Sequence, residues 1–394
     1  MDRLTGIVRA YDWGDLHALA GLLGHDAPGH PEAEYWLGAH PTGPSTLDST
    51  GRTLDKVIAA DPIGLLGPEV ADRFGQLPFL VKLLAAGQAL SIQAHPSAAQ
   101  AAAGFAREEA AGVARTDPAR TYRDANHKPE LICALTPFEA RCGFRDADGG
   151  LAVLAHLGPS LQPVRERLAT LGPADTALWL LGLPPSEAEP LARQAVDAAA
   201  AGLDADLDGP VRAELASTVE VGAAFPGDVG VVVALLLNHV VLEPGEALFL
   251  GAGNVHAYLR GVGVEVMANS DNVIRGGLTA KHIDVPELAA VVDRRSGPVP
   301  VQRPDGPVHH FEVPVPDFGL TRIDTSAGPV DPIEATPVGP EILLVTGGSL
   351  RVDGDAGAVD LGPGQAAFVG PTDGPLELIP GDGVDTLAWR VTAG

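Results

Sequence analysis

Gln93 and His95 have the side-chain types and the spacing of metal ligands. They stand two residues apart in the segment SIQAHP, residues 91–96. Side chains along a β-strand alternate between its two faces, so an amide oxygen and an imidazole nitrogen at this spacing point the same way. Pro96 lacks a backbone N–H and fixes its own φ, so the strand should end directly after His95. The segment therefore predicts half of a metal site at the rim of a β-sheet.

A carboxylate and a second histidine stand in settings of the same kind. Glu130 precedes the apolar run 131–135 and is expected at the start of a strand. His256 is expected where another strand begins, after Gly251 and Gly253, whose conformational freedom allows a tight bend. With the first two ligands, these residues give a set of two imidazoles, one amide and one carboxylate. Such a set leaves a divalent ion with a net charge of about +1 and an open coordination position, and it suits zinc, cobalt or manganese.

The segment from Gly261 to Lys281 carries dense polarity that the metal ligands leave unexplained. Its first glycines lack the third glycine and the helix of a dinucleotide-binding fingerprint, so we reject a Rossmann fold. Arg275 stands beside the glycine pair 276–277, which predicts a loop whose backbone passes close to a ligand. A planar guanidinium forms two hydrogen bonds at once and therefore suits an anionic ligand.

Three kinds of sequence pattern surround these residues and must position them. Residues 1–96 alternate short apolar runs with turn residues, which predicts β structure with some short helices. The segment 97–121 is rich in alanine and charged helix formers, and Ser97 can cap the predicted helix. Residues 147–226 have helical spacing of apolar side chains, divided by prolines into separate helices. After about residue 300 short strands and turns return.

The composition is that of a globular chain without a secretion or membrane signal. Of its 394 residues 45% are apolar, so it can bury a large core in two or three domains. The first residues lack a basic region followed by an apolar one, and we expect no signal peptide. The longest apolar run, 229–242, is too short to span a bilayer and contains Asn238 and His239. We expect a cytoplasmic protein without a membrane partner.

The charge and the cysteines exclude further classes of function. A formal net charge of −25 without a basic patch argues against nucleic-acid binding. Cys133 and Cys142 lack CxxC spacing, so we expect neither a disulfide framework nor a thiolate metal site. If the partner is a small anion, a few Lys and Arg residues must reverse the overall field locally. The oligomeric state is not fixed by the sequence, and a monomer is compatible with it.

Six motifs, in order along the chain, resemble those of the type I mannose-6-phosphate isomerases (phosphomannose isomerases) of the cupin superfamily. They are YDWG at 11–14, WLGAHP at 36–41, LSIQAHP at 90–96, NHKPE at 126–130, GNVHAY at 253–258 and NSDNVIRGGLT at 269–279. The last motif continues as Thr279-Ala280-Lys281, where the family usually has Thr-Pro-Lys, and keeps the lysine. Six ordered motifs are far more specific than any one of them.

The resemblance implies an aldose-ketose isomerase that interconverts mannose 6-phosphate and fructose 6-phosphate through a metal-stabilised enediolate. It also implies one zinc ion per chain. The ligands are then Gln93, His95, Glu130 and His256. Two alternatives remain: a sugar-binding or sensor cupin without turnover, and an isomerase or epimerase for another sugar phosphate.

Moving a carbonyl between C1 and C2 requires a general base near the carbon atoms. Glu265 is one candidate: it lies nine residues after His256 and is expected on the next strand, and burial against an apolar wall would raise its pKa toward the working pH. Its alternative role is a structural ion pair. Lys128, two residues before Glu130, is the other candidate.

The remaining polar candidates would hold the substrate. Arg275 is expected to stabilise the enediolate, and Lys281 to bind an anionic group. Ser91 and Lys82 are further candidates for binding the phosphate.

We predict a mainly β protein with two cupin-like jelly-roll domains and a helical insertion domain. The catalytic domain would comprise residues 1–146, with a helical excursion near 97–121, and residues 229–300. The helical insertion would occupy 147–228. A C-terminal cupin-like domain without a metal site would occupy 301–394, because its glycine-spaced run 364–371 is followed by no histidine.

Overall fold

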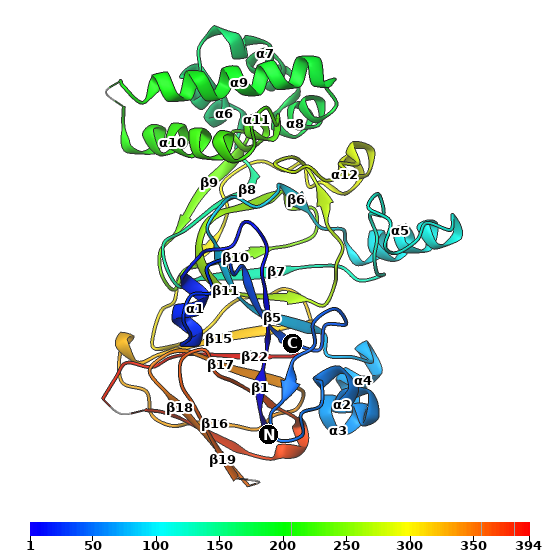
Figure 1. The fold of residues 1–394 in the computed structure, drawn as a ribbon, viewed down its shortest axis with the longest axis vertical. Coiled ribbons are helices and arrows are strands. Elements are labelled where there is room, and N and C mark those ends of the chain that lie inside the picture. Colours follow the sequence, from blue (N-terminus) through cyan, green and yellow to red (C-terminus); the bar gives the residue numbers. More distant parts are fainter. Residues whose placement is uncertain (206, 356, 382) are drawn as a thin grey trace.

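The computed structural model describes the whole chain except residues 206, 356 and 382. A bundle of helices lies at one end of the long axis, a large sheet system in the middle and the C-terminal sheets at the other end (Figure 1). Sheets form the body of the molecule, as predicted for a mainly β protein. No helix in the described part of the chain combines the length and the apolar character that a membrane span requires.

The central sheet is built around one long strand, β11 (His256–Ala268), which pairs with four others. Its main path follows the order β13-β10-β7-β11-β5-β3-β2. The other strands on this path are β13 (Val301–Gln302), β10 (Ala247–Leu250), β7 (Glu130–Ala134), β5 (Phe79–Ala86), β3 (Glu34–Gly38) and β2 (Ile7–Arg9), of which β7 and β5 pair directly with β11. Around its other end β11 also pairs with two further strands, in a branch that contains β6 (Gln93–Ala94), β12 (Ile274–Arg275), β8 (Phe138–Phe144) and β9 (Leu237–Leu242). The candidate ligands Gln93, Glu130 and His256 lie on these strands, and His95 directly follows β6.

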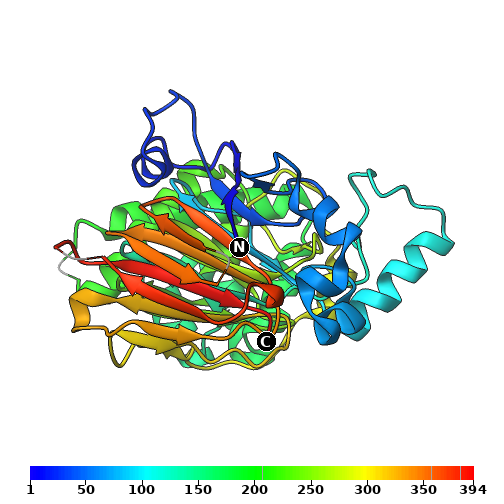
Figure 2. The same ribbon diagram turned by 90° about the horizontal axis from the view of Figure 1, so that it is seen from below.

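The C-terminal sheets form two further layers, seen from their own end in Figure 2. A seven-stranded sheet contains β14 (Val308–His310), β15 (Gly319–Asp324), β22 (Leu387–Thr392), β17 (Glu341–Gly347), β20 (Ala366–Val369), β1 (Asp2–Thr5) and β4 (Thr46–Leu47). A four-stranded sheet contains β16 (Ile333–Ala335), β21 (Leu376–Pro380), β18 (Leu350–Gly354) and β19 (Gly357–Leu361). Strand β1 therefore joins the chain's N-terminus to its C-terminal sheet.

Alternation along β17 shows why the seven-stranded sheet is a middle layer. Ile342 and Leu344 pack in the core shared with the central sheet, whereas Leu343 and Val345 pack in the core shared with the four-stranded sheet. Successive side chains of a strand point to opposite faces. Because both faces of β17 are apolar, both are buried, and the two C-terminal sheets pack continuously onto the centre of the molecule.

Helices occupy the surface and one end of the molecule. The N-terminal third contains α1 (Ala18–Leu23), α2 (Leu54–Ala60), α3 (Pro62–Leu66), α4 (Pro68–Phe74) and α5 (Ala98–Ala110). Ser97 and Gln100 form a capping box at the start of α5, which confirms the predicted helix and its cap. Short 3-10 turns occur at Pro159–Leu161, Thr325–Ala327 and Pro371–Asp373, and α12 spans Val285–Val291.

The helical bundle at the end of the molecule is formed by residues between β8 and β9. Its helices are α6 (Ala147–Ala155), α7 (Gln162–Leu171), α8 (Pro173–Leu181), α9 (Pro185–Gly202), α10 (Gly209–Ala224) and α11 (Gly230–Ala234). This is the segment for which the sequence predicted separate helices divided by prolines, and Pro173 and Pro185 do begin two of them. We call residues 147–234 the insertion.

A buried carboxylate joins the insertion to the sheets. Glu214 of α10 accepts hydrogen bonds from both Arg141 of β8 and Arg145, which follows it. Arg141 also donates to Ser217 of α10 at 3.1 Å, and Arg145 donates to the carbonyl of Leu237 at 2.9 Å. Because Glu214 balances two buried guanidinium groups, its loss would leave both charges uncompensated.

The Glu214→Ala variant should therefore lower the free energy of unfolding by about 3–5 kcal/mol, the cost of breaking a buried ion pair. Urea denaturation followed by circular dichroism measures this. The matched control is Glu220→Ala in the same helix, whose ion pair with Arg260 is solvent-exposed and should cost less than about 1 kcal/mol. Equal decreases in the free energy of unfolding in the two variants would contradict the proposed role of Glu214 in joining the insertion to the sheets.

Candidate metal centre

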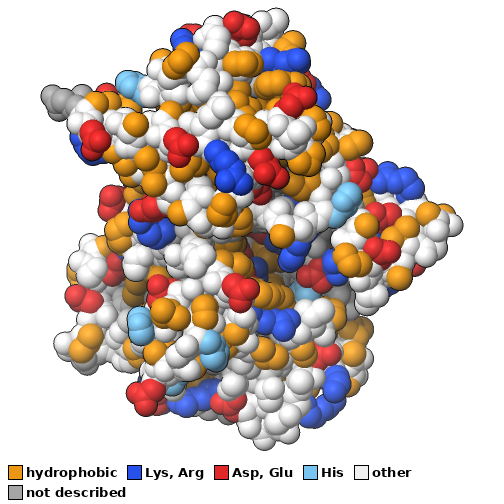
Figure 3. All heavy atoms as spheres, turned by 45° about the horizontal axis from the view of Figure 1, so that its top comes forward, with side chains coloured by type: hydrophobic (Ala, Val, Ile, Leu, Met, Phe, Trp, Pro, Cys, Tyr) orange, Lys and Arg blue, Asp and Glu red, His pale blue; other side chains and the backbone are white. Residues whose placement is uncertain are grey.

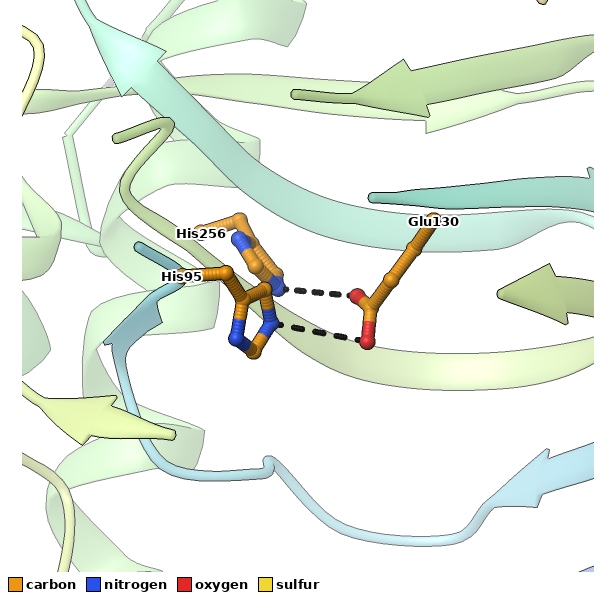
Figure 4. A group of neighbouring side chains, drawn as sticks. All are labelled: His95, Glu130 and His256. Carbon is orange, nitrogen blue, oxygen red and sulfur yellow. Dashed lines mark ion pairs between the residues drawn. The ribbon is translucent and has the colours of Figure 1, made fainter. Parts of the chain in front are cut away.

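His95, Glu130 and His256 converge on one buried point, with the three nearest ligand atoms within 4.8 Å of one another (Figure 4). His95 follows β6, Glu130 is the first residue of β7 and His256 is the first residue of β11. The Nε2 atom of His95 lies 3.4 Å from Oε1 of Glu130, and the Nε2 atom of His256 lies 3.3 Å from Oε2. Three of the four predicted ligands therefore meet at one point.

The hydrogen bonds around this point leave the two Nε2 atoms and the Glu130 carboxylate as hydrogen-bond acceptors. Nδ1 of His95 donates to the carbonyl of Asn272 at 2.8 Å, and Nδ1 of His256 donates to that of Asn254 at 3.2 Å. Each Nε2 therefore presents a lone pair toward Glu130. Both Nε2 atoms and Oε2 of Glu130 are buried without a hydrogen-bond partner among the described residues. Buried acceptors that face one another are unstable alone, so the donor set fits a divalent cation such as zinc.

The charge states of these groups also suit a metal. Burial lowers the pKa of His95 to about 4, so its ring is neutral at neutral pH. Burial opposes the ionisation of Glu130, but Lys128 and His95 outweigh burial and hold the pKa of Glu130 well below its usual range. The Nζ atom of Lys128 contacts Oε1 of Glu130 directly.

Gln93, the fourth predicted ligand, lies in register between two other candidates. Its Cα is paired with His256 of β11 on one side and with Arg275 of β12 on the other. Residues directly opposite each other in antiparallel strands extend their side chains to the same face. Gln93 and Arg275 both line the adjoining cleft. The register thus brings the predicted amide ligand and the predicted catalytic arginine to the same face as His256.

A cleft of about 740 Å³ opens beside the three ligands. Figure 3 shows the molecule hollowed between the insertion and the sheets, with Lys and Arg side chains near the opening. The cleft is lined by every predicted catalytic or substrate-binding residue: Ser91, Lys82, Lys128, Glu265, Arg275 and Lys281. The insertion contributes Ala224 and Phe225 to its wall.

Three buried charges form a network at one wall of the cleft. The Nζ atom of Lys82 donates to Oε1 of Glu34 at 3.2 Å and to Oε2 of Glu265 at 2.9 Å. Burial raises the pKa of Glu265, whereas Lys82 opposes that rise. Burial alone would lower the pKa of Lys82, but Glu265 and Glu34 outweigh burial and raise it. We call Glu34, Lys82 and Glu265 the ion-pair network.

Glu265 was expected on a separate strand after His256, and this expectation was wrong. Both residues belong to the single strand β11, which runs without a break through thirteen residues. The glycines of this strand are places where its neighbours approach closely: a Cβ at Gly263 would lie 2.8 Å from the carbonyl oxygen of Cys133. Because Gly263 has no side chain, the adjacent strand can pack closely against it.

Three cations gather at another part of the cleft. Burial lowers the pKa of Arg275, and Arg123 lowers it further. Burial likewise lowers the pKa of Lys281, followed by the effects of Arg275 and Arg123. We call Arg123, Arg275 and Lys281 the cation group. Such a group opposes the negative field of the chain locally and suits an anionic ligand.

Sequence reasoning missed Glu34 and Arg123. Glu34 lies in β3, just before the WLGAHP motif, and also accepts a hydrogen bond from the indole of Trp36 at 2.8 Å. Arg123 lies three residues before the NHKPE motif. Each residue lies close to one of the six motifs, and this closeness was the one signal available in the sequence. The role of each side chain in the cleft depends on residues that are distant along the chain.

Comparison with known proteins agrees with the geometry. Residues 1–147 match the family model for the catalytic domain of type I phosphomannose isomerase. The chain is 38% identical to the mannose-6-phosphate isomerase of Escherichia coli (strain K12), covering 96% of this chain and 97% of that protein. It is 32% identical to the mannose-6-phosphate isomerase of Bos taurus, covering 94% and 93%.

Solved structures give the same result. A zinc-bound mannose 6-phosphate isomerase superimposes with a TM-score of 0.88 at 35% identity, covering 100% of this chain and 99% of the other. The apo form of the enzyme from Salmonella typhimurium gives the same values. The resemblance seen in the six motifs is thereby confirmed: this chain belongs to the type I phosphomannose isomerase family.

Proposed function

We propose that this chain interconverts mannose 6-phosphate and fructose 6-phosphate. The observation that carries the proposal is the set of three unpartnered buried acceptors beside a cleft that also holds a cation group. Relatives named mannose-6-phosphate isomerase occur in bacteria, fungi and a mammal, which disfavours a sensor cupin and an enzyme for another sugar phosphate. The direct test is to incubate the zinc-loaded protein with mannose 6-phosphate and measure fructose 6-phosphate, whose absence would refute the activity.

One zinc ion per chain fits the donor set. The ligands that we propose are Gln93, His95, Glu130 and His256. When bound, the ion supplies Lewis acidity that stabilises negative charge on neighbouring oxygen atoms. The two imidazoles are already oriented for this role, because the carbonyls of Asn272 and Asn254 hold their Nδ1–H groups.

Glu265 is the general base that we favour. It is buried in the cleft wall, and its raised pKa brings a carboxylate closer to the pKa that proton transfer at neutral pH requires. Its oxygen would take the proton from C2 of mannose 6-phosphate and return it to C1. Lys82 holds this carboxylate in place through the hydrogen bond at 2.9 Å. Lys128 is the second candidate, although its ammonium contacts Glu130.

The remaining residues would bind and orient the substrate. Arg275 is paired in register with Gln93, one of the proposed metal ligands. Within the cation group it therefore lies toward the metal site, where it would stabilise the enediolate. Lys281, Arg123 and Ser91 would hold the phosphate. Lys82 remains a candidate for substrate binding, and its position in the ion-pair network favours contact with the sugar end.

We also propose the finer domain division. Residues 1–146 with 229–300, and residues 301–394, would each form a cupin-like jelly roll, and residues 147–228 of the insertion would form the helical domain. Antiparallel pairing within the central and the C-terminal sheets supports two such units, although β1 and β4 join the C-terminal sheet and β13 joins the central one.

Replacing His256 with alanine should abolish stoichiometric zinc binding and turnover, because it removes a neutral nitrogen ligand. Elemental analysis of the purified variant measures the metal, and circular dichroism checks the fold. The control is His239→Ala, since that histidine pairs with Glu139 at 2.7 Å and lines no part of the cleft. Full zinc occupancy in the His256 variant would refute the ligand assignment.

Glu265→Gln should lower kcat by roughly 10²–10⁴, the usual contribution of a general base, while the zinc content stays near one per chain. The variant should also lose the incorporation of solvent deuterium into substrate, which mass spectrometry detects. If exchange persists in this variant but is lost in Lys128→Met, Lys128 is the base instead.

Arg275→Ala should lower kcat by roughly 10²–10³ with little change in KM, because the arginine acts on charge that develops in the transition state. Arg275→Lys keeps the charge but loses the fork, so it should recover only part of the rate. Steady-state kinetics over a substrate series separates the two constants. A normal kcat with a greatly raised KM would move Arg275 to the phosphate.

A further inference from the structure

The loop after β12, residues 276–281, contains an unfavourable backbone conformation. Leu278 has φ of 53°, and it is the one non-glycine residue with positive φ in the described part of the chain. A bulky residue in this left-handed region costs roughly 1–2 kcal/mol. Such a conformation persists only where surrounding contacts determine it, and it is concentrated at functional sites. Leu278 lines the cleft, and the loop ends at Lys281 of the cation group.

The contacts that hold this turn come from the insertion. Asp228, between α10 and α11, accepts a hydrogen bond from the backbone N–H of Thr279 at 2.9 Å through Oδ2. Its other oxygen accepts the N–H of Gly230 at 2.7 Å. Asp228 thus bridges the insertion and the residue directly after the strained leucine.

The two backbones touch at a pair of glycines beside this bridge. A Cβ added to Gly277 would lie 2.7 Å from Cα of Gly230, and one added to Gly230 would lie 2.5 Å from the backbone nitrogen of Leu278. Real Cβ atoms do not approach so closely, so both positions require glycine. This close approach of the two backbones brings the carboxylate of Asp228 within hydrogen-bond distance of the Thr279 N–H.

The opposite side of the loop is fixed to the metal-binding segment. Ile92 donates its N–H to the carbonyl of Gly277 at 3.0 Å, and Gly276 donates to the carbonyl of Ile92 at 2.7 Å. These bonds adjoin Gln93. The loop is therefore held on one side by the metal-binding strand and on the other by Asp228.

We propose that Asp228 is a positioning residue that holds Lys281 in place for substrate binding, by stabilising the left-handed turn at Leu278. The three cations of the group repel one another, and Lys281 lies two residues after Thr279, whose hydroxyl oxygen accepts the backbone N–H of Lys281 at 3.1 Å. The charge-assisted bond from Asp228 to Thr279 opposes its displacement. This inference rests on the proposed phosphate site, and it assigns to the insertion a part in substrate affinity.

Asp228→Ala should raise KM for mannose 6-phosphate by about 10-fold or more, since hydrogen bonds to charged groups contribute roughly 1.5–3 kcal/mol. The kcat and the zinc content should stay near those of the unchanged protein, because neither Glu265 nor the metal ligands touch Asp228. Asp228→Asn keeps an acceptor and should give an intermediate KM. If the alanine variant does not fold, the asparagine variant decides the KM effect.

The matched control is Asp208→Ala, which removes another aspartate of the insertion that accepts a backbone N–H, that of Val211 at 2.9 Å. Asp208 lies at the exposed start of α10 and away from the cleft, so its loss should leave KM unchanged. An equal rise in KM in both variants, or a fall in kcat with KM intact, would overturn the proposal.

A double-mutant cycle tests the mechanism through Leu278. Glycine adopts positive φ without strain, so Asp228→Ala should raise KM much less in a Leu278→Gly background than in the unchanged protein. Equal effects in the two backgrounds would show that Asp228 does not act through this turn.

Calorimetric binding of inorganic phosphate separates this inference from the proposed activity. The unchanged protein should bind phosphate, and Asp228→Ala should weaken that binding by a factor similar to its KM effect. If the protein binds phosphate but does not isomerise the sugar, the proposed activity is refuted. The comparison of phosphate binding between the unchanged protein and Asp228→Ala then still tests the role of Asp228. If phosphate binding is absent or unaffected by Asp228→Ala, the inference fails.

Discussion

The arrangement of the active site depends on three buried acceptors that have no donor between them. His95, Glu130 and His256 come from three separate segments, and each is brought to the common point by the start or the end of a strand. Their lone pairs repel one another unless a cation lies among them. The fold must therefore supply rigid support for a geometry that is unfavourable by itself, and much of the surrounding hydrogen bonding can be understood as that support.

Asn272 gives part of this support and extends it to the cation group. Its carbonyl orients His95, while its fully buried side chain donates to the carbonyls of Asp124 and Asn126 at 2.9 and 2.8 Å. It also accepts the backbone N–H of Arg123 at 2.8 Å. The same residue thus fixes a metal-binding imidazole and the backbone that presents a cation to the cleft.

The local parts of the site could be predicted from the sequence, and the long-range parts could not. The positions of Glu130 and His256 at the starts of strands follow from neighbouring glycines and apolar runs, and the structure confirms them. The pairing of β1 with β20 and the bond from Asp228 to Thr279 join residues far apart in the chain. Such contacts leave no periodicity or spacing to recognise. Lys82 was predicted only as a phosphate candidate, because its burial between two carboxylates depends on strands that the pattern does not place.

The charges in the cleft are divided in a way that would orient an anionic sugar. Near the metal ligands, the carboxylates of Glu34, Glu265 and Glu130 are accompanied by the ammonium groups of Lys82 and Lys128. Positive and negative groups are therefore close to balance there, before the charge of a metal ion is added. The cation group is less balanced: after burial, the groups that lower the pKa of Lys281 are the positive Arg275 and Arg123, while Asp271 of the cleft lining interacts with Arg123. In a chain with a net charge of −25, this less balanced group is what would attract a phosphate. If the phosphate binds at the cation group, as proposed, the carbon atoms C1 and C2 at the opposite end of the sugar would meet Glu265, and the distribution of charge would select this orientation before any proton moves.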